Sequence, residues 1–172
     1  LIRLICGLQR PTSGTYSIYG REFTSRDIRL SRRRMGAVVE TPSIYLSMTA
    51  RENLRQQFTV LGLPSYTGLE ELLELVGLEN TGKKRARDFS LGMRQRLAIA
   101  QAIMEDPAIL LLDEPLNGLD YEGVKTVYDI LKVQKERGKI ILVASHHEED
   151  IRLLCDEVYW LKDGILERIE DI

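Results

Sequence analysis

The sequence predicts an α/β fold in which helices flank a parallel β-sheet, and two observations support this prediction. From residue 109 onward, apolar runs suited to strands alternate with helical patterns; the runs are ILLL (109–112), IILVA (140–144) and EVYWL (157–161). Strand, helix and strand in this order are typical of parallel strands joined by right-handed crossovers. Earlier in the chain, MGAVV (35–39) is a short apolar run that suits a buried strand.

The middle of the chain has a different, helical character. Apolar residues recur at helical spacing from Thr49 to about Leu78, with a break at GLPSYTG. We therefore expect one domain over residues 1–172. In this division 1–40 and 88–172 form the α/β core, and about 41–87 form an inserted helical subdomain.

The opening stretch LIRLICGL has the apolar spacing of a helix with one face in a core, which includes Leu1 and Leu8. Gly7 and the following RPTSG favour the end of this helix. No capping residue such as Ser or Asp stands before Leu1, so we expect the chain to begin inside a helix.

The composition is that of an ordinary globular protein: of 172 residues, 44% are hydrophobic and 29% are charged. The net charge of −2 provides no global field for nucleic acid, and we expect no nucleic-acid partner. Cys6 and Cys155 stand inside apolar patterns, which indicates buried thiols in a reducing compartment. The sequence has no run of about 18 apolar residues and thus no predicted membrane span.

Two adjacent carboxylates, Asp113 and Glu114, follow the predicted strand 109–112. In open α/β sheets, ligands bind at the carboxyl ends of the strands. Asp113 can hold Mg²⁺, which prefers one or two carboxylates together with phosphate oxygens, and Glu114 can orient or deprotonate an attacking water. A solvated pair at a strand end is the alternative, but the following PLNGLD favours the functional interpretation.

The next predicted strand, 140–144, ends in SHH (145–147). If the two strands are neighbours, these residues lie beside the carboxylates, where a histidine can reach the γ-phosphate of a nucleotide. The alternative is local: Ser145 caps the following helix, and Glu148 completes a capping box. The two interpretations are compatible, and for His147 we favour the local one.

A third candidate lies upstream, in DFSLGMRQRLAIAQAI (88–103), where Ser90 and Gly92 stand at the expected start of a helix. The free N–H groups of a helix N-terminus attract anions, although Ser90 is also an ordinary N-cap residue. The helix leads away from the sheet edge for about 20 Å and strand 109–112 returns, so Ser90 and Asp113 are expected at the same edge.

Taken together, these stretches resemble the ATP-binding subunit of an ABC transporter. SLGMRQRL resembles the signature motif, ILLLDEP the strand with the magnesium aspartate and catalytic glutamate, LNGLD the loop after it, and VASHH the switch histidine. The resemblance implies a sheet of the P-loop NTPase type. In this family the helix LIRLICGL follows directly on the glycine-rich phosphate loop. We therefore expect the chain to be cut before that loop, with the N-terminal β part mostly missing and the piece alone inactive.

Carried over by position, the resemblance implies that ATP and Mg²⁺ are the cofactors. It implies that Asp113 holds Mg²⁺, that Glu114 is the general base or orients water, and that His146 contacts the γ-phosphate. Ser90 and Gly92 are expected to contact ATP held by a partner subunit. These cross-dimer contacts are implied by the resemblance and not by the spacing.

The resemblance also places Asp120 at the dimer interface. Three positions depart from the common family pattern, and one of them is Leu91, which stands where glycine is commonest. Glu40 stands where glutamine is usual, and its carboxylate can still supply an oxygen to Mg²⁺. Met93 stands where a glutamine side chain commonly contacts phosphate, which puts that contact in doubt. FSLGM together with VVETPSIY resembles the branch of the bacitracin-resistance and lantibiotic-immunity type.

We therefore predict the ATP-hydrolysing motor of an ABC transporter that exports peptide antibiotics or similar amphiphilic compounds. The expected partners are a transmembrane permease subunit, contacted through TPSIYLSMTARENL, and a second ATPase subunit, as a homodimer or a pair. The expected location is the cytoplasmic face of the cell membrane. Two alternatives stay open: a soluble ABC ATPase without a transport role, and a regulatory or dimerisation remnant that binds no nucleotide.

Overall fold

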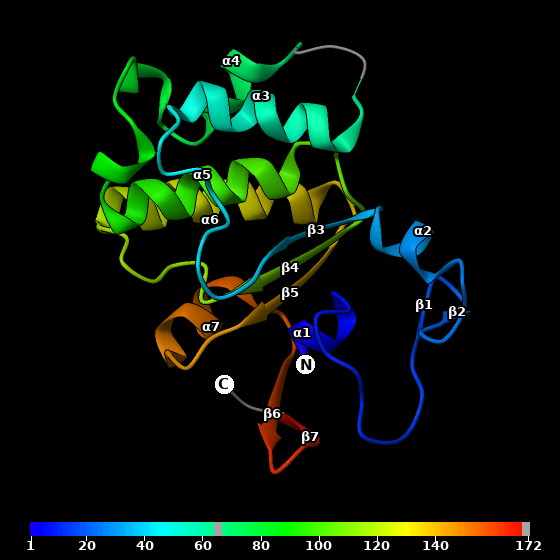
Figure 1. Cartoon of the computed structure of the whole chain (residues 1–172). Helices are drawn as coiled ribbons and strands as arrows, with labels where there is room; N and C mark the ends of the chain where they lie inside the picture. Colours follow the sequence, from blue (N-terminus) through cyan, green and yellow to red (C-terminus); the bar gives the residue numbers. More distant parts are fainter. Residues whose placement is uncertain (64–66, 170–172) are drawn as a thin grey trace.

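Three parallel strands organise the molecule, and the computed structural model describes residues 1–63 and 67–169 of the chain. The strands β3 (Met35–Val38), β4 (Ile109–Asp113) and β5 (Ile140–Ala144) lie side by side in the order β3-β4-β5 (Figure 1). Val38 pairs with Leu112, and Asp113 pairs with Ala144. All three strands therefore end at the same edge of the sheet. Because β4 and β5 are neighbours, the residues after β5 lie beside Asp113 and Glu114.

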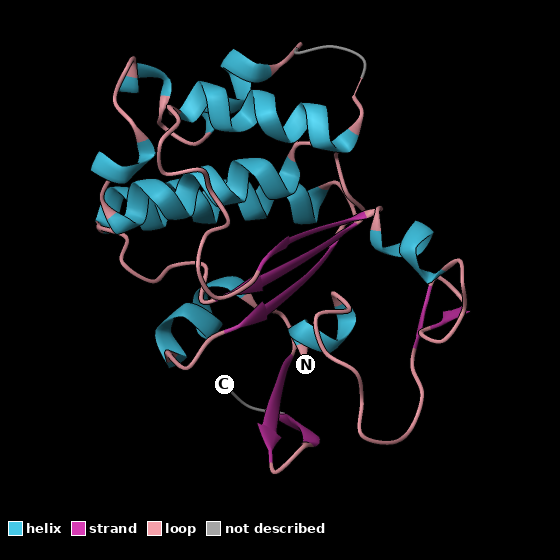
Figure 2. Cartoon of the chain, viewed as in Figure 1, coloured by secondary structure: helices cyan, strands magenta, loops and turns pink. Residues whose placement is uncertain are grey.

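Helices cover both faces of this sheet (Figures 1 and 2). On one face α5 contacts β3 and α6 contacts β5, while α1 contacts β4 from the other side. Beyond α5, the helices α3 and α4 form a further layer. The helices are α1 (Ile2–Ile5), α2 (Ile28–Arg32), α3 (Ala50–Leu61), α4 (Leu69–Leu75), η1 (Glu79–Thr81), η2 (Ala86–Asp88), α5 (Leu91–Ile103), α6 (Tyr121–Glu136) and α7 (Glu148–Leu154).

The apolar run 109–112 builds the core as predicted, whereas the residues of β5 and β6 (Val158–Lys162) are half-buried or exposed. Leu110 and Leu112 of β4 are fully buried and belong to one cluster with side chains from α3 to α6. The predicted helical stretch from Thr49 to about Leu78 contains α3 and α4. Part of its predicted break, residues 64–66, lies outside the described residues. The start of α3 is set by a capping box between Thr49 and Glu52.

The prediction for 157–161 was wrong in its pairing. This segment forms β6 (Val158–Lys162), which pairs antiparallel with β7 (Ile165–Ile169) in a separate hairpin. Asp163 and Gly164 connect the strands with φ of 50° and 82°. An Asp-Gly pair at positive φ forms the tight turn that matches the twist of two hairpin strands, so β6 pairs with the next segment and not with β5. A second short hairpin joins β1 (Ser17–Ile18) to β2 (Arg21–Glu22).

Burial at the start of the chain also differs from the prediction. Ile2 is 4% exposed, whereas Leu1 and Leu8, which were expected in the core, are 49% and 64% exposed. The helix is a single turn, and Gly7, with φ of 78°, lies just beyond it, so the apolar spacing does not continue as a helical face. Cys6 and Cys155 are free thiols and only half-buried, not buried as expected.

Candidate functional site

The carboxyl-terminal edge of the sheet gathers the polar groups that the sequence singled out. Asp113 is the last residue of β4, and Glu114 follows it; both are half-buried. Ser145 and His146 follow β5, the neighbouring strand. The edge therefore presents a carboxylate pair from one strand end beside a hydroxyl and an imidazole from the next.

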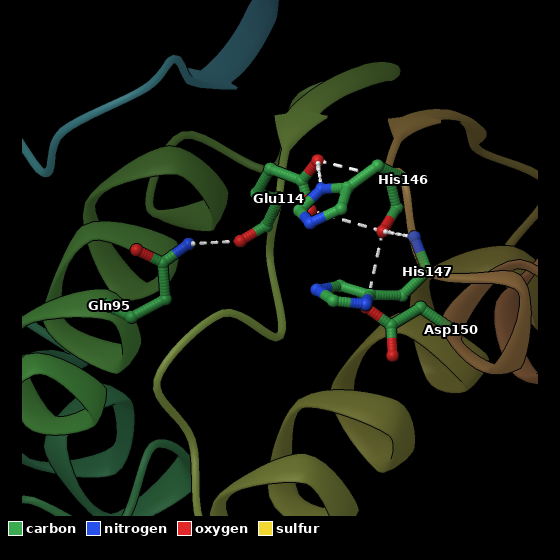
Figure 3. A network of polar contacts seen from close by, with 6 residues as sticks. Gln95, Glu114, His146, His147 and Asp150 are labelled. Carbon is green, nitrogen blue, oxygen red and sulfur yellow. Dashed lines mark hydrogen bonds and ion pairs between the residues drawn. The ribbon is translucent and has the colours of Figure 1, made fainter.

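Glu114 is held in a left-handed backbone conformation, with φ of 50°. Its N–H donates to the carbonyl of Ala144 at 2.8 Å, which continues the ladder between β4 and β5. Its carbonyl accepts a hydrogen bond of 3.3 Å from Nε2 of Gln95, a buried residue of α5 (Figure 3). A non-glycine residue in this conformation is uncommon and needs support from its surroundings, which these two bonds provide.

The side chain of Glu114 reaches the segment after β5 (Figure 3). Its Oε1 accepts from the backbone N–H of His146 at 3.1 Å and lies 2.6 Å from Nδ1 of the His146 ring. Its Oε2 lies 3.1 Å from the Ser145 hydroxyl, which also lies 3.2 Å from Oδ2 of Asp150 in α7. A hydroxyl has one hydrogen, so Ser145 donates to one of the two carboxylates at a time.

These contacts decide the charge of Glu114. Partial burial raises the pKa of its carboxyl, but the hydrogen bonds from the His146 ring and from Ser145 act against it. The charge of the His146 ring and the backbone N–H of His146 add to the lowering, and the net pKa lies below the usual 4.5. Glu114 is therefore ionised at neutral pH and able to accept a proton.

Glu40 lies at the same edge of the sheet but outside this cluster. It follows β3 by two residues with φ of 55°, and its carboxylate forms an ion pair of 2.6 Å with Arg3 of α1. Both side chains of this pair are more than half exposed. The predicted Mg²⁺ ligands Asp113 and Glu40 are thus on adjacent strand ends, with Glu40 already paired with a cation.

The start of α5 packs against the loop that follows the carboxylates. Ser90 is the N-cap of α5, and its hydroxyl accepts from the Met93 N–H at 3.1 Å, as the local interpretation predicted. Gly92 is buried so closely that an added Cβ would lie 2.9 Å from the carbonyl oxygen of Gly118. Asp120 caps α6 through a bond of 3.0 Å from the Gly123 N–H.

The other side chains at this helix start differ in their surroundings. Met93 packs against the hydrophobic core, whereas Ser90 is exposed. A hydroxyl that accepts one hydrogen bond still has its own hydrogen to donate, so Ser90 can serve both as a cap and as a donor to an anion. The predicted site residues therefore lie in three places: the Glu114 cluster with Asp113 beside it, Glu40 after β3, and the contact between the start of α5 and the loop before α6.

One local prediction failed in this region, and three contacts were not foreseen. The helix α7 begins at Glu148 with His147 as its N-cap, and no side-chain capping bond forms. Ser145 instead accepts from the His147 N–H at 3.2 Å and bonds Glu114, so the predicted capping box is absent. Sequence reasoning also missed Gln95, Asp150 and the ion pair of Arg3. The glutamine gave no clear signal in the sequence, because it stands between Arg94 and Arg96.

The donor groups at this edge suit a divalent cation and a phosphate group. Asp113 offers carboxylate oxygens, which Mg²⁺ prefers, and the exposed cap of α5 offers a hydroxyl at a helix N-terminus. Fold and site together define a class: an α/β domain of the nucleoside-triphosphate-hydrolysing type, with its ligands at the carboxyl ends of parallel strands.

Comparisons with known proteins identify the family within this class. Residues 1–117 match the family model described as ABC transporter. The chain is 41% identical over 170 residues to the bacitracin transport ATP-binding protein BcrA of Bacillus licheniformis, covering 98% of this chain and 55% of that protein. It is 36% identical over 173 residues to the lantibiotic transport ATP-binding protein SrtF of Streptococcus pyogenes, covering 99% of this chain and 73% of that protein.

The fold of this chain also matches that of a solved ATP-binding cassette. The dimeric ATP-binding cassette MJ0796, in a post-hydrolysis state bound to ADP and Pi, superposes with a TM-score of 0.82 at 25% identity, over 99% of this chain and 80% of that chain. The chain belongs to the ABC transporter family. It spans about half the length of the bacitracin relative. Within the described residues, no helix has both the length and the hydrophobicity that a bilayer crossing requires.

Proposed function

We propose that this chain is part of the ATP-hydrolysing motor of an ABC transporter that exports peptide antibiotics or similar amphiphilic compounds. The observation that carries the proposal is the hydrogen-bonded cluster of Glu114, Ser145 and His146 beside Asp113. It places an ionised base and an imidazole at the sheet edge where ligands bind. The bacitracin and lantibiotic transport relatives support the class of exported compound.

In this proposal Asp113 and Glu40 hold Mg²⁺ at the ends of two adjacent strands. The ion, when bound, neutralises negative charge on the phosphates of ATP. Glu40 must exchange its ion pair with Arg3 for the metal, and an exposed pair of this kind contributes only about 0–1 kcal/mol. The exchange is therefore energetically accessible.

Glu114 is the proposed general base. Its ionised carboxylate takes a proton from the attacking water, and His146 donates a hydrogen bond to the γ-phosphate. Oε1 of Glu114 and Nδ1 of His146 are engaged with each other, so these two atoms become available to water and phosphate only when the contact opens. Ser145 keeps the second carboxylate oxygen oriented during this exchange.

The start of α5 is proposed to act on ATP bound by a second ATPase subunit. Ser90 has an exposed hydroxyl there, and Gly92 packs closely against the Gly118 carbonyl. Asp120 is proposed to lie at the subunit interface. Met93 contributes through its backbone, since its side chain packs against the core. The dimeric relative bound to ADP and Pi supports a paired arrangement.

A permease contact is proposed for the segment 41–54, within a helical subdomain over about 41–87. Tyr45 and Leu46 are each 48% exposed, although their loop is held in place. The Asn53 side chain accepts from the Tyr45 N–H at 2.7 Å, and the Leu46 carbonyl accepts from the Arg87 N–H at 2.9 Å. Exposed apolar side chains on a fixed loop favour a protein contact over a solvated turn. This contact would locate the protein on the cytoplasmic face of the membrane.

The test expresses the complete reading frame together with the neighbouring permease genes and measures tolerance to bacitracin-like peptides. We expect Glu114→Gln to lower tolerance to the level of cells without the transporter. Equal tolerance of parent and variant would remove the antibiotic assignment. Co-purification of the permease tests the transport role, and its absence would favour an ABC ATPase outside transport.

The permease surface has its own matched control. Tyr45→Ser combined with Leu46→Ser should reduce co-purification of the permease. Val60→Ser, which changes a 64% exposed side chain in α3, should leave co-purification unchanged. Equal loss in both variants would assign the effect to folding and not to this loop.

A further inference from the structure

Two histidines and a carboxylate meet at the edge of the sheet. Among the described residues, Glu114, His146 and His147 are a group of potential metal ligands whose donor atoms all lie within 4.8 Å of one another. The rings of His146 and His147 are 3.9 Å apart between their centroids and tilted by 40°. Figure 3 shows His146 and His147 on the same side of Glu114, on the segment that follows β5.

The chemistry of these donors selects a particular kind of ion. Mg²⁺ prefers ligand sets made of oxygen, whereas two imidazoles and one carboxylate form a common set for Zn²⁺. Zinc ligands lie about 2.0–2.2 Å from the metal in a tetrahedron, so the donors are about 3.3 Å apart. A spacing within 4.8 Å therefore needs only small side-chain rotations to close around the ion.

The surroundings permit these rotations. The side chain of His146 is 69% exposed, and His147 is exposed as well. Nδ1 of His146 lies only 2.6 Å from Oε1 of Glu114, so a ring nitrogen and a carboxylate oxygen are already close to each other. An ion that binds both atoms replaces their direct contact and separates them to about 3.3 Å. A water molecule can take the fourth position, because the histidines face solvent.

We propose that Glu114, His146 and His147 form a binding site for Zn²⁺. Occupation of this site blocks ATP hydrolysis, because it removes the carboxylate of Glu114 and the ring of His146 from the reaction. The inhibition rests on the proposed function, whereas binding of the ion does not.

His147 supplies the third protein ligand of the proposed site. Without it, Glu114 and His146 provide two ligands, which leaves the tetrahedral ion with two open positions. Loss of one of three protein ligands weakens binding by about tenfold or more, since even the loss of a residue that only supports a ligand lowers affinity by about 10–100-fold.

Calorimetric titration of the 172-residue chain with ZnCl₂ tests the site directly. The background carries Cys6→Ser and Cys155→Ser, which removes two half-buried thiols, because a thiolate is itself a common zinc ligand. We expect one bound ion, and an affinity at least tenfold lower in the His147→Asn variant. Glu149→Gln, an exposed carboxylate outside the group, is the matched control and should bind as the parent does. Thermal unfolding of each variant checks that it is folded.

The absence of zinc binding by the folded parent, or equal affinity in the folded His147→Asn variant, would overturn the proposal. The calorimetric result involves no nucleotide, so it stands apart from the proposed function. A second experiment measures ATP hydrolysis by the product of the complete reading frame with and without ZnCl₂. Zinc should inhibit the parent and leave His147→Asn active; inhibition of both to the same degree would place the inhibitory ion elsewhere.

Discussion

Oε1 of Glu114 lies 2.6 Å from Nδ1 of His146 and accepts a hydrogen bond from the His146 backbone N–H at 3.1 Å. The proposed base and the proposed phosphate-binding histidine thus engage each other. In the proposed function both groups act on the nucleotide and its water, so we expect this contact to rearrange during hydrolysis.

Replacement of Glu114 tests its role as the base. In the product of the complete reading frame, Glu114→Gln should lower the rate of ATP hydrolysis about 100-fold or more, because an amide cannot take a proton from water. ATP binding should be retained, since the amide has nearly the same shape. Steady-state hydrolysis and equilibrium nucleotide binding are the measurements, and hydrolysis at the parent rate would exclude this role. His146→Ala should also slow hydrolysis.

The lowered pKa of Glu114 predicts a pH dependence of stability. The folded-state pKa lies below the usual 4.5, so the stabilisation is present above that value and is lost as the pH falls through the folded-state pKa. Urea unfolding of the 172-residue chain from neutral pH down to about pH 3 measures it. The parent should lose more stability below pH 4.5 than Glu114→Gln does. Glu149→Gln should follow the parent, and identical slopes for all three would contradict the prediction.

Close packing between β3 and α5 predicts a strong effect of one methyl group. A Cβ added at Gly36 would lie 1.9 Å from the carbonyl oxygen of Ala102, so the helix must move away from the sheet. Gly36→Ala should lower the free energy of unfolding by about 1–3 kcal/mol, the usual range for overpacking. Ala37→Ser, at the next and exposed position of β3, should change it by less than about 0.5 kcal/mol. Urea unfolding measures both values.

Glu40 provides a test of the proposed metal ligands. Glu40→Gln should raise the Mg²⁺ concentration needed for half-maximal ATP hydrolysis, because it removes a negative charge and leaves Arg3 without its partner. Stability should change by less than about 1 kcal/mol, since the pair is exposed. A Mg²⁺ titration of the hydrolysis rate gives the first quantity, and an unchanged requirement would place Glu40 outside the metal site.

Local patterns in the sequence were sufficient for much of the fold. The apolar run of β4 was correctly predicted as a buried strand, because such a run is stable only where both faces of the sheet are covered. The Ser90 cap of α5 was recognised for a similar reason: a cap depends on residues within one turn. The Asp-Gly pair before β7 is an equally local signal, and it was overlooked.

The contacts that define the candidate site depend on the tertiary structure. Ser145 and His146 meet Glu114 only because Asp113 pairs with Ala144, which sets the register of two strands more than 30 residues apart in sequence. The contact of Arg3 with Glu40 likewise joins α1 to the end of β3. Periodicity and capping report interactions within a few residues. Such local signals were sufficient to predict most helices and strands and to single out the carboxylate pair. The register of the sheet decided which side chains, distant in sequence, share a hydrogen bond.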